Sequence, residues 1–103
     1  MSRTKKIHLS DDHATALADL FRLLGDPTRL RIVVACLRAP LAVSDIAERL
    51  DLSVSLVSHH LRLLKGARLV RAERQGRQVY YEADDVHVRR MVEDMVTHIG
   101  EHG

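Results

Sequence analysis

The chain has 103 residues, of which 46% are hydrophobic, and a formal net charge of +2. This length predicts one small domain over residues 1–103, with a modest core that would gain stability from a dimer interface. The sequence has no signal peptide and no apolar run of about 18 residues, which excludes a membrane-spanning segment and predicts a cytoplasmic protein with no membrane partner.

Charge is distributed unevenly along the chain. Residues 53–80 carry six basic side chains against a single acidic one, a net charge of +5, whereas residues 82–103 carry a net charge of −4. Such a division predicts a surface for a polyanion beside a surface for cations.

The first helix is expected over about residues 11–24. Residues 1–9 are polar and predict a disordered tail. Ser10 is a good N-cap, and the two aspartates after it suit a first helical turn because they oppose the positive helix end. The apolar side chains that share one face of this helix are Leu17, Leu20, Phe21 and Leu24.

A second helix is expected over about residues 27–37. Gly25 ends the first helix, and Asp26 and Pro27 fit the N-cap and the first helical position, where the missing N–H of proline costs nothing. Cys36 is the only cysteine, which excludes an intrachain disulfide and a cysteine-rich zinc site, and its apolar neighbours predict a buried side chain. The other residues expected to be largely buried are Leu30, Ile32, Val33, Val34 and Leu37.

Two further short helices are predicted in the middle of the chain. Ser44 fits the N-cap of the third helix, and Ser53 fits the N-cap of a fourth helix over about residues 53–67. Asp51 and Leu52 form the turn between them. Two short helices joined by a few residues, the second with a polar exposed face, are typical of a helix-turn-helix.

The fourth helix separates into an apolar and a polar face. The polar face carries small hydroxyls, an imidazole and a guanidinium, which are groups that bond to base edges or phosphates in a major groove. A merely solvated face would more often carry Glu and Lys, and this helix has no acidic residue. The expected core residues are Val54, Val57, Leu61 and Leu64. The expected DNA-binding residues are Ser55, Ser58, His59 and Arg62.

A β-hairpin is predicted over residues 69–81. Alternation with β-branched and aromatic residues surrounds a turn expected at Gln75-Gly76. The tip carries Arg74, Gln75 and Arg77. A basic hairpin directly after a helix-turn-helix is typical of a wing that contacts backbone phosphates or the minor groove. The alternative is a solvent-exposed hairpin with charged tips.

The last helix, about residues 85–101, carries candidate metal ligands at both ends. An Asp-x-His pair opens it and a His-x-x-Glu pair closes it, and these residue types bind zinc-like ions. The candidate ligands are Asp85, His87, His98 and Glu101. His87 and His98 share a helix face but lie about 16 Å apart along the axis, so one ion cannot bind both from the same helix.

A second, antiparallel copy of this helix would bring the opening pair of one chain to the closing pair of the other. This geometry predicts a symmetric homodimer with two sites, each shared between subunits. The apolar stripe available for such a helix seam consists of Val88, Met91 or Val92, Met95 and Ile99. The alternative is an ordinary amphipathic helix with exposed histidines, in which Asp85 serves only as the N-cap.

Three stretches of the chain, in this order, resemble the ArsR/SmtB family of bacterial metal-sensing repressors. They are residues 24–32 (LGDPTRLRI), 53–64 (SVSLVSHHLRLL) and 74–81 (RQGRQVYY), within a likeness that covers about residues 14–101. The resemblance implies a mainly α winged helix-turn-helix of four helices, a β-hairpin wing and a fifth helix. It also implies a homodimer formed by the first and last helices, with the fourth helix in the major groove of a palindromic operator.

The resemblance extends to a zinc-sensing branch of the family. That branch carries Asp-x-His on the last helix and, after ten intervening residues, His-x-x-His or His-x-x-Glu. The residues that match this pattern in type and spacing are Asp85, His87, His98 and Glu101. Other branches bind metal with cysteines at the start of the third helix, where this chain has Leu41-Ala42-Val43, so that site is absent.

We therefore expect a metal-derepressed repressor that is not an enzyme. The metal-free dimer would bind operator DNA, and Zn(II) at the closed four-ligand site would fix the angle between the two DNA-reading heads and release the DNA. The family's architecture suggests one route for this effect, a hydrogen bond from the non-ligating nitrogen of His98 to the backbone near Arg68.

Two alternatives stay open, and a third, a hydrolase, is disfavoured. A nickel or cobalt sensor would recruit His8 or His13 as further ligands, because Ni(II) and Co(II) prefer six, whereas His102 is expected to belong to the tail. A ligand-independent DNA-binding protein would have an affinity that zinc and chelators leave unchanged. A metal-dependent hydrolase would need an open coordination position, a general base and a pocket, and four ligands leave no such position.

Overall fold

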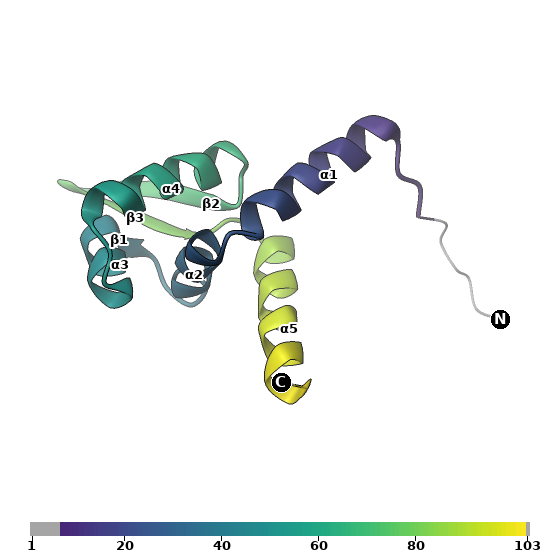
Figure 1. Ribbon diagram of the computed structural model, residues 1–103. Helices are drawn as coiled ribbons and strands as arrows, with labels where there is room; N and C mark the ends of the chain where they lie inside the picture. Colours follow the sequence, from purple (N-terminus) through teal and green to yellow (C-terminus); the bar gives the residue numbers. More distant parts are fainter. Residues whose placement is uncertain (1–6, 103) are drawn as a thin grey trace.

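The computed structural model describes residues 7–102. Of the predicted N-terminal tail, residues 1–6 lie outside the described range, and residues 7–9 belong to no helix or strand. The elements follow the predicted order with one added strand (Figure 1). They are α1 (Asp11–Leu24), α2 (Pro27–Ala35), β1 (Leu41–Ala42), α3 (Val43–Leu50), α4 (Val54–Gly66), β2 (Val70–Gln75), β3 (Gln78–Ala83) and α5 (Val86–His102).

Four helices begin at predicted side-chain caps, and the cap of α5 is Asp85. Ser10 Oγ accepts a hydrogen bond from the His13 backbone N–H at 3.1 Å, Asp26 caps α2 in the same way, and Ser53 caps α4. The predicted cap at Ser44 is wrong, because α3 already begins at Val43 and no side chain caps it. The chain enters α3 directly from β1, so pairing with the sheet fixes this entry.

The predicted hairpin is part of a three-stranded antiparallel sheet in the order β1-β3-β2. Leu41 pairs with Tyr81 and Ala42 with Tyr80, so the short β1 adds an edge strand that the sequence pattern did not predict. The turn lies one residue later than expected, at Gly76-Arg77, because Gln75 and Gln78 still pair. Gly76 adopts φ 65°, a left-handed conformation that glycine tolerates without steric cost.

The core lies between α2, α3, α4 and the sheet. Cys36 is buried as predicted, and burial raises the pKa of its thiol to about 12, which keeps it protonated and a poor metal ligand. Val54 was expected in the core but is 52% exposed, since it occupies the first turn of α4 beyond the packed layer. The largest fully buried side chains include Ile32, Ile46, Leu61, Leu64 and Leu69.

The helices α1 and α5 extend away from this core, at the end of the molecule opposite the β2–β3 turn (Figure 1). The Cα radius of gyration is 15.5 Å, compared with about 13 Å for a compact domain of this length. Leu30 and Val34 of α2, predicted to be buried, are 38% and 37% exposed. No helix within residues 7–102 is long and apolar enough to span a membrane.

The register of α4 generates the first prediction. Leu61→Ala should lower the free energy of unfolding by about 2–5 kcal/mol, because it opens a cavity in the core. Val54→Ala, on the same helix, should lower it by less than about 0.5 kcal/mol because its side chain is largely exposed. Urea denaturation at one fixed protein concentration measures both, and equal losses would contradict the observed orientation of α4.

Candidate metal centre and nucleic-acid interface

Asp85 caps α5 and holds an ionised carboxylate at its start. Its Oδ1 accepts hydrogen bonds from the backbone N–H groups of Val88 and His87, each at 3.0 Å. These hydrogen bonds keep the pKa of the Asp85 carboxyl below its usual range, and the bond from Val88 has the largest effect. Both end on the same oxygen, which leaves Oδ2 for a metal ion. The cap also removes Asp85 from the regular helical path, as expected.

The four candidate ligands are all exposed and form two separate pairs on α5. Asp85 and His87 lie at its start, and His98 and Glu101 lie in its last turns. Within residues 7–102, no three His, Cys, Asp or Glu side chains gather so that they could hold a metal ion. A single chain therefore holds the members of each pair close in sequence but does not bring the two pairs to a common point.

An apolar groove of about 370 Å³ lies between α1 and α5. Phe21 of α1 is 53% exposed there, and Met95 and Ile99 of α5 are 56% and 66% exposed. The first half of the predicted α5 stripe does pack on the core, since Val92 is buried, but the second half remains open to solvent. A neighbouring hollow is lined by His87 together with Leu69 and residues of α1.

A group of ion pairs connects the start of α5 to the wing. Glu82, on β3, is only 19% exposed and accepts from Arg71 of β2 at 2.7 Å and from Arg89 of α5 at 3.0 Å. The Arg89 side chain also donates to the Ala83 carbonyl at 3.4 Å. The turn that carries Asp85 and His87 is thereby tied to both strands of the wing. The sequence did not point to Glu82, because its ion pairs depend on the exact register of the wing and on the packing of α5 against it.

The predicted DNA-binding residues of α4 lie on its outer face. Ser55, His59 and Arg62 are exposed, and Ser58 is half-buried. The adjacent His60 differs from His59: its Nδ1 is buried without a hydrogen-bond partner in the described structure, and burial lowers the pKa of the ring. Of the His-His pair in the sequence, the first residue is exposed and the second is half-buried.

The wing residues at the β2–β3 turn are fully available to a ligand. Arg74, Gln75 and Arg77 are exposed, and the ion pairs found within residues 7–102 involve none of them. Arg62 of α4 is likewise outside these pairs. The guanidinium groups of α4 and of the wing can therefore contact phosphates without first breaking an ion pair.

Comparison with known proteins gives one family. A model described as bacterial regulatory protein, arsR family, matches residues 26–72. The chain is 42% identical to a transcriptional repressor SmtB homolog of Synechocystis sp. over 90% of its length and 70% of the relative's. It is 37% identical to a cadmium resistance transcriptional regulatory protein CadC homolog of Staphylococcus aureus, over 95% and 81%.

A solved structure of a winged helix-turn-helix domain has the same fold as this chain. The homodimeric winged helix-turn-helix DNA-binding domain of Mb0332 from Mycobacterium bovis superposes with a TM-score of 0.81 at 27% identity. The superposition covers 94% of this chain and 93% of that domain. Both α1 and α5, which leave the core, therefore lie within the part that the two folds share.

Proposed function

Because the chain belongs to the ArsR/SmtB family of bacterial regulatory proteins, with a winged helix-turn-helix fold, we propose that it is a metal-responsive transcriptional repressor. It binds operator DNA as a homodimer and is released by Zn(II) held between subunits. One observation carries the zinc proposal: two exposed ligand pairs lie at opposite ends of α5, a helix with an exposed apolar face.

The apolar groove supports the homodimer. Phe21, Met95 and Ile99 together expose a continuous apolar surface that a second copy of α1 and α5 would remove from water. An isologous interface repeats the same residues on both subunits, so antiparallel α5 helices bring Asp85 and His87 of one subunit toward the closing pair of its partner. Each interface then carries two equivalent sites.

The donor set fits zinc. Asp85 has an ionised carboxylate with Oδ2 unshared, and His87, His98 and Glu101 are exposed and available. Two imidazole nitrogens and two carboxylate oxygens form the closed tetrahedral set that Zn(II) accepts at structural sites, where it cross-links elements without opening a catalytic position. The predicted ligands are therefore suited to holding two helices in one relative orientation.

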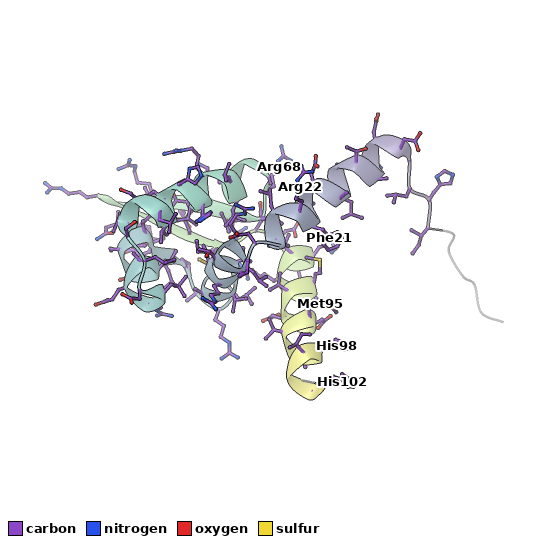
Figure 2. The ribbon with its side chains drawn as sticks, in the orientation of Figure 1. Phe21, Arg22, Arg68, Met95, His98 and His102 are labelled. Atoms are coloured by element: carbon purple, nitrogen blue, oxygen red, sulfur yellow. The ribbon has the colours of Figure 1, made fainter. Side chains whose placement is uncertain are left out.

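Contacts at the start of α5 support a connection to the DNA-reading elements. The Asp84 N–H donates to the Leu69 carbonyl at 3.1 Å, so the start of α5 adjoins the turn between α4 and β2. Arg68 in this turn has φ 62°, and Figure 2 shows it away from His98 of the same chain. The proposed bond from His98 to this backbone therefore joins two subunits, since the partner's His98 would approach His87 beside Leu69.

DNA binding in this proposal uses α4 and the wing of each subunit. Ser55, Ser58, His59 and Arg62 would read the major groove, and the residues of the wing tip would contact phosphates. Two heads related by a two-fold axis match a palindromic operator. Zn(II) that fixes the α5 helices of the two subunits against each other would oppose DNA binding if it set an unsuitable angle between the two DNA-reading heads. The coupling free energy between metal and DNA binding is typically about 1–3 kcal/mol.

His98→Ala tests the proposed function. In the full chain, the variant should bind an operator selected from random duplexes as tightly as wild type, because His98 is not one of the residues proposed to contact DNA. Zn(II) should weaken operator binding by wild type about 5–150-fold and should hardly affect the variant. Fluorescence anisotropy at fixed salt measures both affinities, with Asp94→Asn, an exposed change elsewhere on α5, as the matched control.

Two results would contradict this assignment. If His98→Ala still released DNA with zinc, His98 would not belong to the regulatory site. If neither zinc nor a chelator changed the affinity of wild type, the protein would be a ligand-independent DNA-binding protein. Weak rather than intense d–d absorption of the Co(II) form would instead indicate six ligands and the nickel or cobalt alternative.

The wing generates a separate prediction. Arg74→Ala should weaken binding to all duplexes alike and reduce the slope of log affinity against log salt by about 1, because a phosphate contact is lost. Arg62→Ala on α4 should instead relax the preference at one base pair by about 1–3 kcal/mol. Affinities for operator variants across a salt series separate the two, and a changed base preference with Arg74→Ala would contradict a phosphate role.

A further inference from the structure

The helix α5 continues one residue beyond its predicted end and includes His102. This residue was expected in a tail, but it lies one helical turn after His98. The two imidazole rings have centroids 4.8 Å apart and planes inclined by 50°. Figure 2 shows both rings on the same side of α5, beyond Met95. Two exposed imidazoles thus stand next to each other within a single subunit.

Helix geometry gives His98 two polar neighbours in the following turn. At 100° per residue, Glu101 lies about 60° to one side of His98 and His102 about 40° to the other. Histidines at i and i+4 on one helix face are a spacing at which two imidazoles bind one zinc ion. The adjacent rings of His98 and His102 match this spacing, and no comparable contact between His98 and Glu101 is found within residues 7–102.

We propose that His102 is a metal ligand that forms a chelating pair with His98. This deepens the proposed function, because it rests on His98 as a ligand, and it changes the donor set. Asp85 and His87 of the partner subunit would then meet two imidazoles, giving three nitrogens and one carboxylate. In this arrangement Glu101 is replaced as a ligand, or it adds a fifth donor.

The chemistry of this set differs in charge and in hardness from that of the set that includes Glu101 in place of His102. Replacing the carboxylate of Glu101 by a neutral imidazole leaves a divalent ion with one anionic ligand rather than two. Imidazole nitrogen suits Zn(II), Cu(II) and Ni(II), whereas carboxylate-rich sites suit harder ions. The pair within one helix also persists in a separated subunit, where it offers a bidentate site with the remaining positions open to water.

Metal affinities of the full-length dimer test the proposal. Zn(II) and Co(II) are titrated against a competing chelator into wild type, His102→Ala, Glu101→Gln and His98→Ala. His102→Ala should weaken binding of both ions by about tenfold or more, as expected for loss of a direct ligand. The matched control is Asp94→Asn, which removes an exposed carboxylate one turn before His98 and should leave both affinities unchanged.

Side-chain NMR gives a second, independent readout. In protein labelled with ¹⁵N-histidine, Zn(II) should shift one ring nitrogen of His102 together with one of His98, as direct coordination requires. If His102 only stabilised the end of α5, Zn(II) would not produce a coordination shift in the His102 ring of the wild-type protein. The far-ultraviolet circular dichroism of His102→Ala should match that of wild type.

The outcomes separate this inference from the proposed function. If Glu101→Gln and His98→Ala weaken binding while His102→Ala does not, His102 is not a ligand and the four-ligand site stands. If none of the three weakens binding, both proposals fail. If His102→Ala and His98→Ala both weaken binding and the His102 ring shifts, the inference holds whatever the effect of Glu101→Gln.

Discussion

The proposed homodimer depends on an apolar surface that a single chain leaves exposed. Phe21 of α1 and Met95 and Ile99 of α5 are more than half exposed, whereas the core beneath them is closed. Exposed apolar groups of this size in a continuous groove cost free energy in water, and pairing with a second copy removes them from it. The extended shape of the chain has the same origin, because α1 and α5 have contacts with the core only at one end (Figure 1).

This same surface relates the two functional regions that we propose. The ends of α5 carry the candidate metal ligands, and the start of α5 is joined to the wing through Arg89, Glu82 and Arg71. In this proposal, a change in the angle between paired α5 helices would be transmitted to the wing by ion pairs around a largely buried carboxylate, and to α4 through the backbone at Leu69. The metal and the DNA need not be close in this proposal, since each would favour one arrangement of the same interface.

Sequence patterns predicted most of the fold, because its helices have strong local signals. The caps at Ser10, Asp26 and Ser53 and the glycine turn of the wing depend on neighbours a few residues away. The patterns missed β1, which is only two residues long and exists through pairing with a distant strand. They also predicted a buried Val54, which is exposed, and they did not indicate the ion pairs of Glu82. Both features depend on how the elements pack against one another rather than on local sequence. The ligand pairs were visible as spacing, but the site that we propose for them would require a second chain.

A mixed dimer tests most directly whether each site is shared between subunits. One subunit carries Asp85→Asn with His87→Ala, which keeps an oxygen at the N-cap of α5, and the other carries His98→Ala with Glu101→Gln. The two are refolded together and separated by different affinity tags, and bound zinc is counted. We predict that neither parent homodimer binds zinc tightly and that the mixed dimer binds one ion, because one of its two metal sites combines both intact pairs. A mixed dimer that binds no zinc, or parent homodimers that bind as wild type does, would contradict this prediction.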